Sequence, residues 1–419
     1  MYRLLLFSII LGCTSPPSRE AFVVKLAMWG PLGELAPTGN ETALASIAQP
    51  WVYERLVTID AAGELRPSLA ASVDRLSNKE LRVEVRRDAT FSDGTPVTDV
   101  DVIQSLEPAG LRAIKSDGAL LIESRQEGLP ADALLLNALI FRRVQDKFLG
   151  TGPFAVASQT PTELRLARRI PAAGRINDVR IIAYDTPRDA FAHTLKGDTN
   201  LIVDVESRWL EFFRGVPSLQ IIRGTGRSTD SILFNPELPR SERLQLERIL
   251  GSQRVRDLAY DGGECAEGSG GDEPGPPAGR PLRVVSWGPF ERLALASRRV
   301  LADRAGEVSQ LVPEEAVSRV RNRDFDLVTA RPLRWPPSAL ALVWRTGAPY
   351  NLIGYSNPAV DRAVDAGDWR AAHAALRQDP PGAFVCTREQ IAVVDVRIVN
   401  PRLGPYEALE TLPEWEIVR

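Results

Sequence analysis

The chain has 419 residues, and its 51 Lys and Arg nearly balance its 54 Asp and Glu, which gives a formal net charge of −3. Apolar residues make up 44% of the chain and charged residues 25%, close to the average of soluble globular proteins. This composition argues against a collagen-like repeat, a largely disordered chain or a polytopic membrane protein. It also lacks the clustered basic excess of a nucleic-acid binder, so we expect no nucleic-acid partner.

The N-terminus has the features of a secretory signal. A basic residue precedes an unbroken apolar run that is too short to span a bilayer, since a spanning helix needs about 20 apolar residues. Gly12-Cys13 resembles the end of the bacterial lipobox, where the freed Cys carries lipid. We therefore expect a lipoprotein signal peptide over 1–13, lipidation of Cys13 and a spacer over 14–20. The alternatives are an ordinary signal peptide or an apolar first strand with an incidental Cys.

These features predict an extracytoplasmic protein, periplasmic or on the cell surface, that is held to the membrane by its lipid anchor alone. In such an oxidising compartment, Cys265 and Cys386 could form a disulfide or remain independent, and their spacing does not decide between the two. The chain has only three Cys and two His, and none of them has the spacing of zinc ligands. We expect no metal site, no cofactor and no catalytic residues.

Apolar periodicity predicts alternating strands and helices. A clear strand is 81–86, where apolar and charged residues alternate, and a clear helix is 97–107, where Thr98 or Asp99 is the candidate N-cap. In chain order we expect a strand at 22–29, a helix over 44–57 interrupted near Pro50, short strands over 58–93, the helix 97–107, strands at 163–168 and 179–184, a helix at 187–195 and a strand at 201–205.

A Gly-, Pro- and acid-rich stretch at 261–281 contains too few apolar residues to pack, and we interpret it as a flexible loop or linker. After it, we expect a strand at 281–287, a helix at about 290–304 and a strand at 325–328. The chain is thus expected to form two α/β units with a strand-rich insertion.

Several motifs resemble those of the extracytoplasmic solute-binding proteins of bacterial ABC importers, specifically the peptide/nickel group. The longest match is 85–98, VRRDATFSDGTPVT, which leads into Asp101-Val102 and Ser105 and is similar to that family's F-s-D-G-t-P-v-T…D-V-x-x-S stretch. Weaker matches follow the family's order, and they are 52–57, 60–70, 150–154, 196–198, 233–235 and 351–361.

The resemblance implies an α/β, two-lobed periplasmic-binding-protein-like fold with mixed sheets, discontinuous lobes and a strand-rich subdomain. On that basis we expect lobe I at 21–49, 150–235 and 392–419, its subdomain at 50–149, and lobe II at 236–391 with 261–281 as a surface loop. The chain departs from the family at Leu35-Ala36-Pro37, where many members have Leu-Asp-Pro, and Asp99 stands where the family usually has Ala. These differences weaken any transfer of substrate class.

A cleft that encloses a small solute needs aromatic walls and a few polar groups. In peptide-binding members, a Trp and then an Asp follow the strand that corresponds to Phe325-Asp326; here Trp335 matches the Trp, and Ser338 stands in place of the Asp. The nearby cations favour an anionic ligand over an ordinary peptide. We expect the ligand-binding residues to be Trp335, Arg331, Arg334, Ser338, Tyr350 and Trp287; the alternative is that the Arg side chains face solvent and the aromatic residues belong to the core.

These observations predict a binding protein without catalytic activity. It captures a small solute, peptide-like or otherwise, between two lobes and delivers it to an ABC permease with its ATPase. The alternative is a sensory or scaffolding lipoprotein that retains the same fold. An extracytoplasmic hydrolase is disfavoured because the sequence lacks a catalytic constellation.

Overall fold

The computed structural model describes residues 22–38, 43–60, 63–126, 128–226, 228–260, 265–267, 279–333, 336–404 and 407–418. The predicted signal peptide, Cys13 and the spacer lie outside these residues. None of the described helices combines the length and the apolar character needed to cross a membrane.

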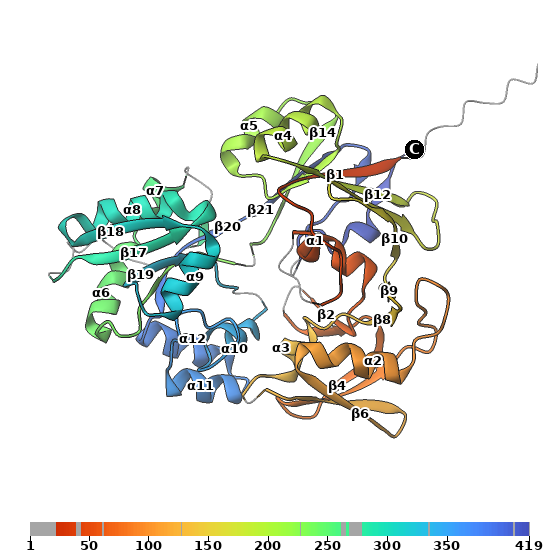
Figure 1. Cartoon of the computed structure of the whole chain (residues 1–419), viewed down its shortest axis with the longest axis horizontal. Coiled ribbons are helices and arrows are strands. Elements are labelled where there is room, and N and C mark those ends of the chain that lie inside the picture. Colours follow the sequence, from red (N-terminus) through yellow and green to blue (C-terminus); the bar gives the residue numbers. More distant parts are fainter. Residues whose placement is uncertain are drawn as a thin grey trace, which may run out of the picture.

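A mixed seven-stranded sheet forms the body that we call the first lobe, on the right of Figure 1. Its central strand β1 is parallel to both of its neighbours, whereas the outer strands pair antiparallel. In order across the sheet, the strands are β10 (Phe154–Gln159), β11 (Glu163–Arg168), β12 (Asp178–Tyr184), β1 (Val23–Trp29), β13 (Leu201–Val203), β21 (Gln390–Asp395) and β14 (Leu219–Gly224).

Separate apolar clusters cover the two faces of this sheet. One contains residues of α4 (Pro187–Lys196) and α5 (Leu210–Phe213). The other contains residues of α1 (Ala43–Val52) and of the C-terminal segment, where β22 (Ile398–Val399) pairs with β23 (Glu416–Ile417). Trp51 of α1 fastens the two segments together by donating its indole N–H to the Leu409 carbonyl oxygen at 2.7 Å.

A four-stranded antiparallel sheet forms the subdomain. Strand β5 shows the alternation that the sequence predicts, since Leu81 and Val83 are buried between more exposed polar residues. The strands are β4 (Ala70–Arg75), β5 (Glu80–Val85), β7 (Ala119–Ser124) and β6 (Leu111–Ser116), and they are joined by the hairpins β2 (Val57–Ile59) with β3 (Leu65–Pro67) and β8 (Phe141–Val144) with β9 (Lys147–Gly150), and by helices α2 (Asp99–Leu106) and α3 (Ala131–Leu135).

A mixed six-stranded sheet forms the second lobe, on the left of Figure 1. Residues of α6, α7 and α8 pack with strands of this sheet in one apolar core cluster, and residues of α9 to α12 pack with it in another. The strands are β16 (Cys265–Glu267), β20 (Gly382–Arg388), β15 (Asp230–Phe234), β19 (Leu327–Ala330), β17 (Leu282–Trp287) and β18 (Ala305–Leu311), and the helices are α6 (Arg240–Leu250), α7 (Gln253–Ala259), α8 (Glu291–Leu301), α9 (Pro313–Arg321), α10 (Ala339–Trp344), α11 (Pro358–Asp365) and α12 (Trp369–Gln378).

Two details of the chain path differ from the sequence-based expectation. The predicted boundaries after 235 and 391 are each displaced by a few residues, because β15 pairs within the second lobe and β21 begins within the first. The stretch 261–281, interpreted as a flexible loop, contains the short strand β16, which pairs with β20. The mixed sheets, discontinuous lobes and strand-rich subdomain are as the resemblance implies.

Candidate functional site

Two adjacent crossings connect the lobes. The chain leaves the first lobe after β14, enters the second at β15, and returns between β20 and β21 through Glu389. The crossings run in close contact, since a Cβ at Gly226 would lie 1.9 Å from the Arg388 carbonyl oxygen. Next to them, the buried hydroxyls of Thr229 and Thr387 are 2.8 Å apart. Two short crossings that run side by side in opposite chain directions can absorb the rotation of a hinge between domains.

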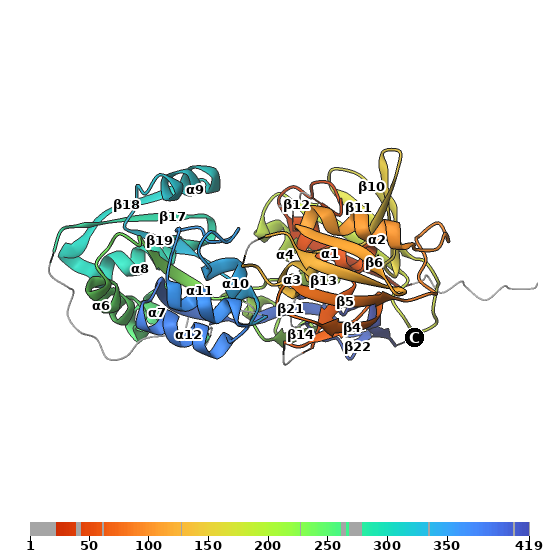
Figure 2. The ribbon, with the colours of Figure 1, turned by 90° about the horizontal axis from the view of Figure 1, so that it is seen from below.

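The lobes also meet far from these crossings, where α3 of the subdomain faces α10 (Figures 1 and 2). A single apolar cluster runs from the subdomain sheet through α3 into α10 to α12. At the polar edge of this cluster, the Asn78 side-chain amide donates to the Asp365 carbonyl oxygen at 2.5 Å. The Asp365 carboxylate accepts a hydrogen bond from Arg345 Nε at 3.0 Å. We call this region, with Gly128 packed against the Arg345 guanidinium, the interlobe contact.

A cavity of about 360 Å³ lies beside this contact, and we call it the interlobe cavity. The first lobe contributes residues on the chain after β1 and on α1, the subdomain contributes the end of α2 and the α3 region, and the second lobe contributes α10 and the turn after it. The lining residues are Pro37, Thr38, Gln49, Ser105, Pro108, Ala109, Gln126, Leu134, Asn137, Ala138, Leu139, Leu342, Pro349 and Tyr350.

Of the residues predicted to bind ligand, Tyr350 lines this cavity. It is 58% exposed and follows α10, where its backbone N–H donates to the Leu342 carbonyl oxygen at 3.0 Å. Ser338 is buried immediately before α10 and is not among the described lining residues. Arg334 and Trp335 lie outside the described residues.

Arg331 is placed at the edge of the second lobe next to the crossings. Its guanidinium binds Asp230, with Nε–Oδ1 at 2.5 Å and Nη2–Oδ2 at 3.3 Å, and it lies 5.2 Å from the centre of the Phe290 ring. Burial acts to lower the pKa of Arg331, but the attraction of Asp230 outweighs it and raises that pKa. Asp230 thus already balances the charge that we expected to hold an anionic ligand.

Asp230 itself is 3% exposed and accepts a further hydrogen bond from the Tyr260 hydroxyl at 3.0 Å. Burial and the neighbouring carboxylate raise the pKa of Tyr260, which therefore stays protonated and donates. Trp287 packs edge-on against Phe290, with ring centres 5.8 Å apart, so it lies near Arg331. Neither Trp287 nor Arg331 is among the described residues that line the interlobe cavity.

Sequence reasoning missed the amide-bearing residues of the cavity wall, Gln49, Gln126 and Asn137. They come from α1, from the end of the subdomain sheet and from the turn after α3, and no motif links these three positions in the sequence. A common site becomes visible only when the lobes and the subdomain are placed together.

Comparison with solved structures identifies the architecture. The substrate-binding protein CtaP of an ABC transporter from Listeria monocytogenes aligns with a TM-score of 0.77 and 14% identity, over 95% of this chain and 99% of that one. The oligopeptide-binding protein AppA from Bacillus subtilis, in complex with a nonapeptide, aligns with a TM-score of 0.72 and 14% identity, over 95% of this chain and 99% of that one. This chain has the fold of ABC-transporter substrate-binding proteins.

A third structure with this binding-protein fold is NikA from Staphylococcus aureus in complex with Ni(L-His)2, with a TM-score of 0.72 and 13% identity, over 92% of this chain and 97% of that one. At the level of sequence, no family model matches the chain and no curated protein is significantly similar to it. The described part of this chain contains no group of three or more His, Cys, Asp or Glu side chains placed to hold a metal ion.

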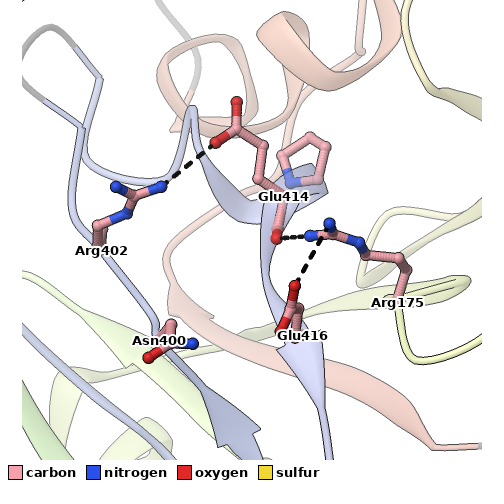
Figure 3. A pocket seen from close by; sticks show the side chains of 6 residues that line it. Arg175, Asn400, Arg402, Glu414 and Glu416 are labelled. Atoms are coloured by element: carbon pink, nitrogen blue, oxygen red, sulfur yellow. Dashed lines mark hydrogen bonds and ion pairs between the residues drawn. The ribbon is translucent and has the colours of Figure 1, made fainter.

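A second hollow, of about 630 Å³, lies on the first lobe of this binding-protein fold (Figure 3). Its charged side chains are paired with one another, with Arg175 Nη2 at 3.4 Å from Glu416 Oε1 and Arg402 Nη2 at 3.7 Å from Glu414 Oε2. Its described lining residues come from this lobe alone, so it lies on one lobe and not between the two.

The two Cys residues whose pairing the sequence left open form a disulfide, Cys265–Cys386. It ties β16 to the strand that leads into the return crossing. The bond fixes part of the stretch 261–281 to the second-lobe sheet.

Proposed function

We propose that this chain is a member of the peptide/nickel group of solute-binding proteins and is the capture component of a bacterial ABC importer. The observation that carries the proposal is the interlobe cavity, which both lobes and the subdomain line on a fold shared with ABC-transporter substrate-binding proteins. A solute in such a cavity contacts both lobes at once. It therefore stabilises the closed arrangement relative to the open one.

Within this proposal the protein is extracytoplasmic. Lipid on Cys13 anchors it to the membrane, and the closed form is presented to a permease with its ATPase. The disulfide supports this location because structural disulfides persist in oxidising compartments. Of the predicted contact residues, Tyr350 is the one whose described position favours contact with the solute.

The decisive experiment is native mass spectrometry of the chain that begins after Cys13, purified without refolding, followed by small-angle scattering before and after solute is removed. We expect a defined additional mass and a larger radius of gyration once the solute is gone. If no solute is carried and no library of peptides, sugars and chelates changes the radius of gyration, the capture function is wrong.

Lipid anchoring is tested separately, by metabolic labelling with an alkyne fatty acid in the full chain. We expect the wild type to be labelled and found with membranes, and Cys13→Ser to lose both properties. A Ser15→Ala variant controls for changes near the cleavage site. Equal labelling of Cys13→Ser and wild type would contradict the anchor.

A further inference from the structure

The lining of the interlobe cavity combines neutral polar and apolar side chains and carries no charge among its described residues. Its hydrogen-bonding side chains are amides and hydroxyls, and the rest of the wall is apolar. No Asp, Glu, Lys, Arg or His belongs to the described lining. This contrasts with the second hollow, whose described lining contains two Arg and two Glu side chains.

The inner wall is well shielded from water. Gln49 is 8% exposed, and the apolar side chains of Leu134 and Leu342 face the cavity from α3 and α10 at 6% and 4% exposure. An ammonium or carboxylate held against this wall would lose its hydration without gaining an opposite charge. Desolvation of an unpaired ion costs much more than desolvation of an amide that finds a hydrogen-bond partner.

The polar side chains of the wall differ in their availability. Ser105 is occupied, because its single hydroxyl proton lies between the Asp101 and Phe141 carbonyl oxygens, at 2.7 and 2.9 Å, and its oxygen accepts from the Phe141 N–H. Gln49 uses its NH₂ group on the Ala36 carbonyl oxygen at 2.5 Å. Tyr350, at the open side, has a hydroxyl that can donate to or accept from a solute.

We infer that the solute held in this cavity is uncharged and polar, a molecule recognised through amide-type hydrogen bonds and apolar contact. The inference rests on the proposed function and narrows its substrate class, replacing the anionic ligand suggested by the sequence. The volume corresponds to roughly a dozen water molecules, since each occupies about 30 Å³ in the liquid, so the solute is small.

Matched probes separate charge from shape. Cyclo(Gly-Leu) and the linear dipeptide Gly-Leu have the same side chains, but the cyclic form has two neutral amides where the linear one has an ammonium, a carboxylate and one amide. Isothermal titration of the chain beginning after Cys13 compares the two, together with nine further cyclic and linear pairs. We expect the tightest binder of the panel to be cyclic and its linear partner to bind with a dissociation constant at least about tenfold higher. A tenfold difference corresponds to about 1.4 kcal/mol, which is less than the cost of desolvating an unpaired ion.

The outcomes distinguish this inference from the proposed function. Preferential binding of a linear dipeptide would overturn the neutral-solute inference and leave solute capture intact. Failure of every probe, together with an unchanged radius of gyration, would count against capture itself and so against both.

A charge introduced at the exposed rim of the cavity provides a second test, with Asn137→Asp as the variant; the Asn137 amide also donates to the Ala133 carbonyl oxygen at 3.1 Å. Its matched control is Asn322→Asp, at the exposed C-terminal end of α9, away from the cavity. We expect Asn137→Asp to weaken cyclo(Gly-Leu) binding about five- to tenfold and to strengthen binding of the cationic dipeptide amide Gly-Leu-NH₂, because the new carboxylate pairs with its ammonium. Identical titrations of the two variants would overturn the assignment of this cavity.

Discussion

Asp326 carries a carboxylate on which two arginines of the second lobe, Arg280 and Arg283, converge. It is 1% exposed, its Oδ1 lies 2.6 Å from Arg280 Nη2, and its Oδ2 accepts from the Arg283 backbone N–H at 2.8 Å. The residue is therefore a buried charge with its partners in place, at the start of β19. A change that removes its charge leaves these donors without their anion.

We expect Asp326→Asn to lower the free energy of unfolding by about 1–3 kcal/mol, because the amide keeps some of the hydrogen bonds but not the charge. Urea denaturation followed by circular dichroism measures the change. The neighbouring Asp324 forms an exposed pair with Arg283, so Asp324→Asn is the matched control and should cost less than about 1 kcal/mol. Equal losses for the two variants would contradict the structural role of Asp326.

The same residue makes stability depend on acid pH. Burial acts to raise the pKa of Asp326, but hydrogen bonds and charge from Arg280 and Arg283 outweigh it and lower that pKa below its usual range. For Asp101, burial is likewise outweighed by hydrogen bonds from Arg142 and Thr98, and its pKa is also lowered. Both contributions are present above the unfolded-state pKa of about 4 and are lost as pH falls through the folded-state values.

We therefore expect the free energy of unfolding to fall as the pH is lowered below about 4, and to fall less steeply in Asp326→Asn. Urea denaturation curves collected at about pH 2 to 7 measure how the free energy of unfolding changes with pH in the wild type and in Asp326→Asn. A wild type whose stability is constant across the acid limb would be inconsistent with these two lowered pKa values.

For individual residues, the sequence indicated which residue types a binding site uses but not which of these residues lie next to one another in the fold. Arg331 and Tyr350 were both candidates, yet Asp230, distant in the sequence, binds the Arg331 guanidinium, while Tyr350 lines a cavity together with amides from three other segments. Charge neutralisation by a partner 101 residues away depends on the pairing of β15 with β19. Local sequence patterns contain no information on that pairing.

Helix α2 lies within two residues of its expected bounds, since 97–107 was predicted and Asp99–Leu106 is observed, and of the two candidate N-caps the structure has Thr98. Thr98 is its N-cap, the Thr98 side chain accepts from the Asp101 N–H, and Asp101 caps the Thr98 N–H in return at 2.8 Å. This reciprocal capping box is a local pattern, so it can be recognised without the fold. Strand β16 was missed for the opposite reason, since its pairing with β20 comes from a distant strand and a disulfide within a stretch of Gly, Pro and acid.

We expect Thr98→Ala to destabilise the protein by about 1 kcal/mol, through loss of the cap at the start of α2. Val100→Ala in the same turn is the control, because Val100 is exposed and its truncation should change stability by less than about 0.5 kcal/mol. Thermal unfolding monitored by circular dichroism compares the two. A Thr98→Ala variant as stable as wild type would show that the capping box adds nothing here.

On the scale of the whole molecule, family-like motifs predicted two lobes and a subdomain, while the contact between α3 and α10 had no sequence signal. The residues of α3 are buried and, apart from Asp132, apolar, as core residues of many helices would be. Which surface they face depends on how the lobes are oriented, and that orientation follows from the crossings and not from local pattern. The contact closes the molecule on the side opposite the crossings (Figure 1).

The interlobe contact leads to a prediction about opening. Gly128 has φ of +72°, and a Cβ there would lie 1.6 Å from the Arg345 guanidinium carbon, so Gly128→Ala must displace Arg345 from the subdomain. We expect this variant to shift the ligand-free protein toward an open arrangement, seen as a larger radius of gyration in small-angle scattering.

Gly118→Ala is the matched control. Gly118 has a similar φ of +78°, but a Cβ there would meet nothing within 4 Å. Both variants therefore carry the backbone cost of a left-handed Ala, of order 1 kcal/mol, and only one disturbs the contact between the lobes. If the two variants scatter alike, the α3–α10 contact does not hold the lobes together; if only Gly128→Ala expands, this contact contributes to the stability of the closed arrangement alongside the solute.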